Sequence, residues 1–122
     1  MHELSIAYSL VELASAAAAE AGVAHISVVH LRLGALAGVV RDALEFGFEI
    51  AAADTPLAGA RLAIEELPVQ IYCPSCDAPA TLPDVRQFCC PRCGTPTARI
   101  VQGRELELVA LEYEETAERL NV

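Results

Sequence analysis

The feature that most constrains this chain is a pair of cysteine motifs in one short stretch, YCPSCDAPATLPDVRQFCCPRCG. Two residues separate the cysteines of each pair and thirteen separate the pairs, which comprise Cys73, Cys76, Cys90 and Cys93. A two-residue gap lets one tight turn direct both sulfurs at the same point, and tetrahedral Zn(II) takes four thiolates at about 2.3 Å. Pro74 and Pro91 stiffen both turns, and Gly94 supplies a permissive backbone after the second. The spacing predicts a closed zinc site with four cysteine ligands.

The segment around these cysteines, residues 69–98, has few large apolar side chains. Burial alone would not stabilise it, so we expect metal binding to supply much of its folding free energy. A redox-active dithiol pair and a set of disulfides are the alternatives that the cysteines leave open. Cys89 directly precedes Cys90, and an extended backbone would point it the opposite way, so we interpret it as a free thiol and not a fifth ligand.

Length and charge limit the classes of protein that the chain can belong to. Its 122 residues, of which 54% are hydrophobic, suffice for one compact core and a small satellite. A formal net charge of −9 has the wrong sign for binding phosphates, so neither nucleic acid nor an anionic membrane is an expected partner. No apolar run reaches the length of a membrane span, and no basic segment opens the chain. We therefore expect a cytoplasmic protein.

Hydrophobic periodicity predicts two helices. Polar and apolar residues recur at helical spacing over residues 4–21, and Gly22 is suited to end that helix. A second helical pattern runs from Val40 to Asp54, with its apolar side formed by Val40, Ala43, Leu44, Gly47, Phe48 and Ala51. Thr55 and Pro56 stop it, because a residue that precedes proline is disfavoured in the helical region.

Three stretches alternate as strands do. In residues 24–33, Val29, Leu31 and Leu33 share one face; residues 60–67 and 104–113 alternate in the same way, the latter with Leu106, Leu108 and Ala110 inward. The predicted fold class is α+β: a small mixed three-stranded sheet with two helices, plus an inserted zinc ribbon with four cysteines. The predicted domains are 1–68 with 99–115, the ribbon 69–98, and a tail 116–122.

The chain opens Met-His-Glu, which offers a metal chelate that no interior histidine can form. The terminal amine of Met1, the amide nitrogen of His2 and the His2 imidazole can close fused rings in one plane. Ni(II) and Cu(II) accept such square-planar nitrogen donors, and Glu3 could fill the fourth position through its backbone nitrogen or its carboxylate. The alternative interpretation is that His2 and Glu3 only begin the first helix, with Glu3 near its positive end.

Four stretches together resemble the HypA/HybF family of nickel-insertion accessory proteins for [NiFe] hydrogenase. They are MHELSIAYSLVELA at the start, VVHLRLGALAGVVRDALEFGFEI in the middle, the four-cysteine ribbon, and GRELEL after it. The resemblance covers nearly the whole chain in matching order. It implies a small α/β nickel-binding domain interrupted by a zinc ribbon, and a metallochaperone that passes Ni(II), with a HypB-type GTPase, to the hydrogenase large subunit.

Carried over residue by residue, the resemblance implies His2 as the nickel ligand, supported by the Met1 amine and by Glu3. It also implies the four ribbon cysteines as ligands of structural Zn(II). Some family members place an acidic side chain near the nickel from the loop ahead of the second helix. Here Asp42 is the candidate, and it fits equally well as an ordinary residue in the first turn of a helix.

Other classes of protein remain to be weighed against this one. The chain has three histidines, and it shows no nucleophile elbow, phosphate-binding glycine loop or His-Glu-x-x-His motif, so we expect no enzyme. A zinc ribbon that binds nucleic acid through Arg86, Arg92 and Arg99 would be expected in a basic chain, not in this acidic one. A scaffold that carries zinc alone, with no nickel role for His2, is the strongest alternative.

Overall fold

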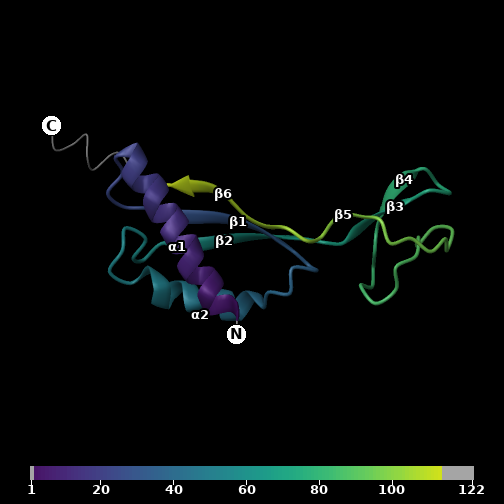
Figure 1. Cartoon of the computed structure of the whole chain (residues 1–122), viewed down its shortest axis with the longest axis horizontal. Helices are drawn as coiled ribbons and strands as arrows, with labels where there is room; N and C mark the ends of the chain where they lie inside the picture. The colour runs from purple at the N-terminus through teal and green to yellow at the C-terminus, as the bar shows by residue number, and fades with distance from the viewer. Residues whose placement is uncertain (1, 114–122) are drawn as a thin grey trace. The chain divides into compact units, whose positions relative to one another are not determined.

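The computed structural model describes residues 2–113, and for His2 it describes the backbone alone. Met1 and the predicted tail, 116–122, lie outside these described residues. Two helices and six strands follow one another along the chain (Figure 1): α1 (His2–Ala21), β1 (Val28–Gly34), α2 (Arg41–Ala52), β2 (Arg61–Leu67), β3 (Gln70–Cys73), β4 (Ala78–Thr81), β5 (Ile100–Gln102) and β6 (Leu106–Glu112). The α+β class predicted from the sequence is confirmed.

The chain forms two compact units. The first contains Met1–Leu31, Val39–Ile64 and Leu108–Val122, and the second contains Arg32–Gly38 and Glu65–Glu107. The first unit therefore holds both helices, and the second holds all of the predicted ribbon. Each unit is described below by itself.

The main sheet has the strand order β2-β1-β6, so β1 lies in the middle. Backbone hydrogen bonds from Arg61 to Ser27 and from Ala35 to Leu67 advance in the same direction along β2 and β1, which makes that pair parallel. The bonds from Ser27 to Glu112 and from Gly34 to Glu105 advance in opposite directions, which makes the β1 and β6 pair antiparallel. The sheet is mixed, as predicted, and α2 forms the crossover that its parallel pair requires.

The alternation predicted for β1 is confirmed, because Val29, Leu31 and Leu33 are buried while Val28, His30 and Arg32 are partly exposed. The alternation predicted for the last strand is wrong. Leu106 and Ala110 are exposed, and the residues of β6 that pack against the core are Leu108 and Leu111, which lie three positions apart. Strand β6 lies at the edge of the sheet, where strict period-two burial is not enforced.

Helix α1 packs one face against α2 and the sheet. Its buried residues Ala7, Leu10, Val11, Ala14 and Ala18 recur at three- and four-residue spacing, and the small alanines let the two helices approach closely. Gly22 follows with φ 74°, the left-handed conformation that ends a helix at no steric cost for glycine. On length and composition alone, residues 3–21 would suffice to span a membrane. The buried face identifies α1 as a core helix.

Helix α2 contributes Leu44, Gly47, Phe48, Ala51 and Ala52 to the core. Two residues predicted for this apolar side, Val40 and Ala43, are exposed instead. Val40 adopts an extended conformation as the N-cap, so it precedes the helix and does not follow its periodicity. The predicted end of the helix is confirmed within two residues, because Ala52 is its last residue.

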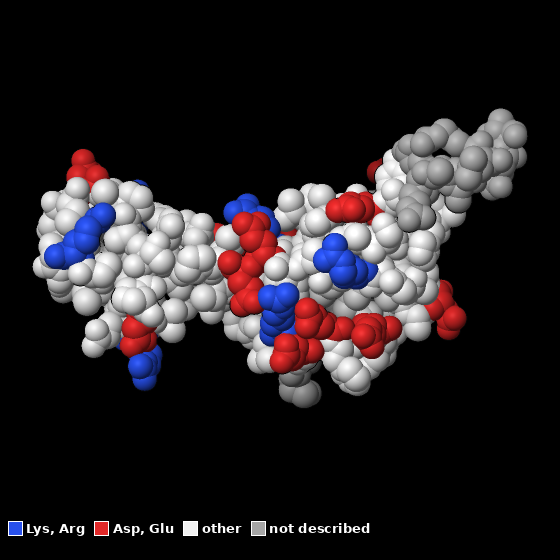
Figure 2. All heavy atoms as spheres, turned by 180° about the vertical axis from the view of Figure 1, so that it is seen from behind, with Lys and Arg blue, Asp and Glu red and all other residues white. Residues whose placement is uncertain are grey.

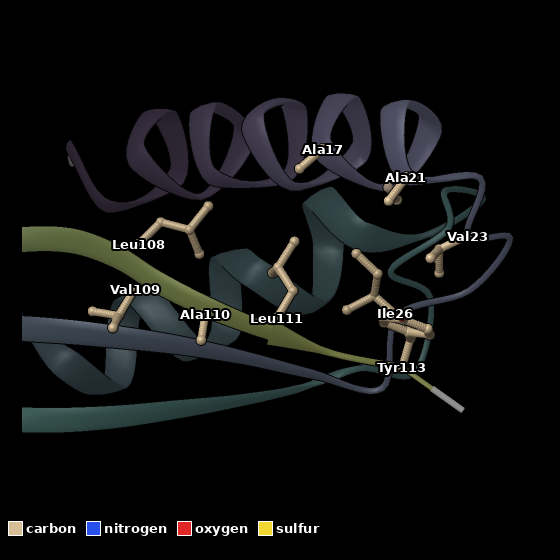
Figure 3. Close-up of a pocket in the computed structure, with 10 residues that line it drawn as sticks. Ala17, Ala21, Val23, Ile26, Leu108, Val109, Ala110, Leu111 and Tyr113 are labelled. Atoms are coloured by element: carbon tan, nitrogen blue, oxygen red, sulfur yellow. The ribbon is translucent and has the colours of Figure 1, made fainter. Parts of the chain in front are cut away.

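The first unit also carries an apolar groove of about 380 Å³ beside the second half of α1 (Figure 3). Figure 3 shows Leu108 and Leu111 of β6 pointing toward Ala17 and Ala21 of α1, with Tyr113 at one end. Tyr113 is the one titratable side chain among the lining residues. The groove is thus a hydrophobic surface feature.

The second unit contains a three-stranded sheet that the sequence did not predict, with the order β4-β3-β5. Strands β3 and β4 form a hairpin in which Cys73 faces Ala78, and β5 pairs antiparallel with β3 on the other side. A small core supports this sheet and includes two of the four paired cysteines: Val69, Ile71, Cys73, Ala80, Leu82 and Cys90. The strands have three or four residues each, too few for periodicity to reveal them.

Two glycines in the second unit let main-chain segments lie against each other. A Cβ atom at Gly34 would come within 2.2 Å of the carbonyl carbon and oxygen of Gly103. Gly103 itself has φ 130°, and a Cβ there would approach the Cα of Val69 to 3.2 Å. Because the obstructing atoms belong to the backbone, no side-chain rotation can relieve these contacts.

We predict that Gly34→Ala lowers the free energy of unfolding by about 2 kcal/mol or more, because the added methyl group would displace the main chain at Gly103. Gly47→Ala is the matched control. It adds the same methyl group within α2, where the nearest atom would lie at 3.4 Å, and alanine is the better helix former by about 0.5–1 kcal/mol. Urea unfolding at a fixed metal content should separate the two variants, and equal midpoints would contradict the prediction.

Candidate metal centre

Four cysteines meet at one end of the second unit. Each of their Sγ atoms lies within 4.8 Å of all the others, and the cluster consists of Cys73, Cys76, Cys90 and Cys93. The distances are 3.5 Å between the sulfurs of Cys73 and Cys93 and 4.0 Å between those of Cys76 and Cys90. Four thiolates at about 2.3 Å from a tetrahedral ion stand about 3.8 Å apart. The cluster therefore has the size of a tetrahedral thiolate site.

The two cysteine pairs are held by turns of the same construction. The first pair spans the turn of the β3–β4 hairpin, where the Cys76 N–H donates to the Cys73 sulfur at 3.4 Å. The second pair is closed by a hydrogen bond from the Gly94 N–H to the Cys90 carbonyl at 2.8 Å. In each case the residue after the pair is left-handed, Asp77 with φ 53° and Gly94 with φ 78°. The sequence pointed to Gly94, and Asp77 could have been found from its matching place in the first motif.

Hydrogen bonds give the thiols of the cluster different pKa values. The backbone N–H of Cys93, followed by that of Arg92, lowers the pKa of the Cys90 thiol to about 6. Hydrogen bonds to the neighbouring sulfurs, that of Cys93 first, raise the pKa of Cys76 to about 12. Four adjacent sulfurs cannot all become thiolates while their mutual repulsion is uncompensated. A divalent cation supplies the compensating charge, so the donor set fits a metal ion.

Polar side chains connect the two turns around the sulfurs. The Thr95 hydroxyl lies 3.1 Å from the Cys93 sulfur, lowers the pKa of that thiol, and donates to the Ser75 hydroxyl at 3.0 Å in the opposite turn. The Tyr72 hydroxyl donates to the Asp77 carboxylate, which holds the strained left-handed residue in place and raises the tyrosine pKa. These contacts orient the turns in the way that outer-shell partners support metal ligands.

Cys89 lies outside the cluster. It is half-buried and forms an isolated bridge with Pro96, while the N–H of the adjacent Cys90 donates to Thr95. All five cysteines are free thiols, so no disulfide links the two pairs. Cys89 is thus not among the four sulfurs that lie within 4.8 Å of one another.

The three arginines near the cluster each have a partner within the second unit. Arg86 pairs with Asp84 at 3.0 Å, Arg92 donates to the Pro79 carbonyl at 3.3 Å, and the Arg99 guanidinium lies over the Tyr72 ring. Arg92 also lies beside the Cys90 sulfur, which raises its pKa. These contacts give the arginines a local role near a negatively charged cluster, and they weaken the case for a phosphate-binding surface.

The predicted nickel residues lie at the start of the first unit. His2 is the first residue of α1, Glu3 is 6% exposed, and its carboxylate accepts the Val40 N–H at 2.9 Å. The structure thereby joins the beginning of α1 to the N-cap of α2, a contact that the sequence did not predict. Asp42 is exposed in the first turn of α2, and Met1 lies outside the described residues.

The two other histidines lie elsewhere. His25 is exposed in the loop before β1, and His30 on β1 contacts the Glu112 carboxylate on β6. The described residues therefore do not gather these two histidines at a common site.

Comparison with known proteins identifies the class to which this fold and cysteine cluster belong. The family model described as hydrogenase/urease nickel incorporation, metallochaperone, hypA matches residues 1–113. A hydrogenase maturation factor HypA of Roseiflexus sp. (strain RS-1) is 66% identical over 115 residues, covering 94% of each chain. The factor of the same name from Chloroflexus aurantiacus is 67% identical over 112 residues, covering 92% of this chain and 98% of its own.

Two solved structures share the fold. The solution structure of the Ni metallochaperone HypA from Helicobacter pylori is 24% identical with a TM-score of 0.62, and covers 92% of this chain and 97% of its own. A second solution structure of a HypA protein, also 24% identical, has a TM-score of 0.69 over 93% of this chain and 97% of its own. The fold of this chain is thus that of these two HypA structures. The chain belongs to the HypA family of nickel-incorporation metallochaperones.

We predict that the purified chain holds one divalent metal ion in the cysteine cluster and that Cys90→Ser loses it, because three thiolates and a hydroxyl bind far more weakly. Cys89→Ser is the matched control, since it changes the adjacent thiol outside the cluster and should keep the metal. Elemental analysis and titration with a thiol reagent give the measurement. Equal metal content in the two variants would contradict the assignment of Cys90.

Proposed function

We propose that this chain binds Ni(II) at its amino terminus and delivers it for maturation of the [NiFe] hydrogenase active site, while the cysteine cluster holds a structural Zn(II). The observation that carries the proposal is the family match from residue 1 to residue 113, which includes both the Met-His-Glu start and the four cysteines. Hydrogenase maturation factors 66% and 67% identical to this chain support it.

The proposed nickel donors are the Met1 amine, the His2 amide nitrogen and the His2 imidazole. Helix α1 begins at His2, so the N–H group of His2 belongs to the first turn and has no intrahelical acceptor. It can therefore be deprotonated without loss of a helix hydrogen bond. The Glu3 carboxylate is buried and already engaged by Val40, which favours the Glu3 backbone nitrogen as the fourth donor. Asp42, exposed in the next helix, is the weaker candidate.

The zinc ion would be bound by Cys73, Cys76, Cys90 and Cys93. Two of these sulfurs are buried within the small core of the second unit, so zinc would complete a structural site closed on all four sides. Such a cage suits permanent binding, whereas nickel delivery requires an accessible site whose ligands can be replaced one at a time. We accordingly propose that the first unit is the nickel domain and the second the zinc domain.

The proposed partners are a HypB-type GTPase and the hydrogenase large subunit, with neither nucleic acid nor membrane involved, and the proposed location is the cytoplasm. The chain would act without catalysing a reaction, because ligand exchange transfers the metal. Membership in a family of nickel-incorporation metallochaperones supports these assignments.

We predict that His2→Ala lowers the affinity for Ni(II) about a hundredfold or more and leaves the zinc content at one per chain, because one chelate ring is lost. His25→Ala is the matched control, since it removes an exposed histidine elsewhere in the first unit and should bind nickel as the wild type does. Calorimetric titration of untagged protein gives the measurement. Equal nickel binding by His2→Ala and wild type would exclude His2 as a nickel ligand and contradict the proposed site.

We further predict that two residues added before Met1 abolish this nickel binding, because the first nitrogen becomes an amide and can no longer donate as an amine. The same two residues added after Val122 should leave it unchanged. The absorption band of planar nickel bound by nitrogen reports the difference directly. Undiminished binding by the amino-terminal extension would exclude the terminal amine as a ligand.

A further inference from the structure

The outer face of α2 displays large apolar side chains. Phe46 is 67% exposed and Ile50, one turn later, is 46% exposed. An isolated exposed apolar residue is normal, but residues at positions i and i+4 of a helix form a continuous surface. Neither side chain contributes to the core of the first unit. This surface therefore lowers solubility without adding to the stability of the fold.

The same apolar surface extends to the beginning of α1. The ideal Cβ position of Gly47 lies 3.5 Å from Leu4 Cδ1, and Leu4 is itself 42% exposed. Ile50 lies three residues after Gly47 on the same side of α2, so Leu4 and Ile50 border the same crossing of the two helices. The hydrogen bond between Glu3 and Val40 holds this end of α1 against the start of α2. Leu4, Phe46 and Ile50 are called the helix-pair patch below.

Acidic side chains surround this patch. Asp42 and Glu49 are exposed four residues before and three residues after Phe46, which places both beside its ring. Arg41, the one basic residue of α2, is paired with Glu45 at 3.3 Å. Figure 2 shows acidic and basic side chains interspersed on the face drawn there. The negative charge beside Phe46, the apolar centre of the helix-pair patch, is therefore that of Asp42 and Glu49.

We propose that the helix-pair patch is the surface on which the nickel-receiving protein docks, and that this partner presents an apolar pocket bordered by lysine or arginine side chains. The inference rests on the proposed function. Transfer by ligand exchange requires donor and acceptor ligands to meet at one metal ion, so the partner must cover the surface next to His2. Leu4 lies two residues from His2, and the patch continues from it along α2.

Charge decides between the possible occupants. A second copy of this chain would place Asp42 and Glu49 against the same residues of its partner, and the whole chain carries a net charge of −9. The chain's own residues 114–122, EETAERLNV, contain three glutamates and one arginine, so they also have the wrong sign. The negative charge of Asp42 and Glu49 repels a second copy and residues 114–122, and it attracts a basic partner.

The test uses a double variant that carries both Phe46→Ala and Ile50→Ala, and the control variant is Leu13→Ala. Leu13 is 60% exposed and, nine residues after Leu4, lies on the opposite side of α1. Purified proteins are titrated with Ni(II), and each variant then replaces the wild type in the cells of its source, where the nickel content of the hydrogenase large subunit is measured. We expect unchanged nickel affinity in both, and at least about a tenfold loss of delivered nickel in the double variant alone.

A charge variant tests the border separately. Glu49→Lys should bind nickel normally and deliver less of it, because a basic partner would be repelled. Delivery equal to wild type in both the double variant and Glu49→Lys, or an equal loss in Leu13→Ala, would overturn the docking surface. Absence of nickel binding in all of the proteins, wild type included, would instead contradict the proposed function.

Two further measurements separate the other occupants. If a second copy of the chain occupied the patch, sedimentation at about 0.05 M and about 0.5 M salt would show a dimer for the wild type and a monomer for the double variant. Removal of residues 114–122 would shift the amide resonances of Phe46 and Ile50 if the tail covered it. We expect a salt-independent monomer in the first measurement and unshifted resonances in the second, and either opposite result would overturn the proposal.

Discussion

The convergence of four sulfur atoms on one point is the constraint on which the second unit depends. Cys73 and Cys90 belong to its small core, while Cys76 and Cys93 approach them from the outside of two matched turns. Burial in the core brings the sulfurs together, whereas adjacent thiolates repel one another. A bound cation compensates this repulsion. Short strands with only three or four residues can then persist, because the ligands fix the turn of the β3–β4 hairpin and the turn that follows Cys90.

Much of the fold was predictable because it follows from burial with a regular period. The face of β1 formed by Val29, Leu31 and Leu33 is enclosed on the core side, and the sequence alternates accordingly. Where one side of an element faces water, burial no longer enforces a regular period. The prediction that Leu106 and Ala110 of β6 face inward was therefore wrong. Val40 was also misplaced, because a helix cap obeys hydrogen-bonding rules and not periodicity.

In the metal centre, too, some features were predictable from the sequence and others were not. Cysteine spacing predicted which four sulfurs would meet, since a two-residue gap permits one turn geometry for both pairs. The supporting contacts could not be predicted, because Thr95 and Ser75 lie twenty residues apart and meet only through the fold. The contact between Glu3 and Val40 is equally long-range, and it joins the first turn of α1 to the start of α2.

The approach of Gly34 to Gly103 has a consequence for how this sequence can evolve. At most packing contacts, a substitution that enlarges one side chain can be compensated by a substitution that makes its neighbour smaller. Here a Cβ atom added at Gly34 would lie 2.2 Å from main-chain atoms of Gly103, and no substitution at Gly103 removes those atoms. Neither position has a conservative replacement, and no second change elsewhere restores the lost space. Relatives that diverge freely on the surface of the helices should therefore keep this pair of residues together.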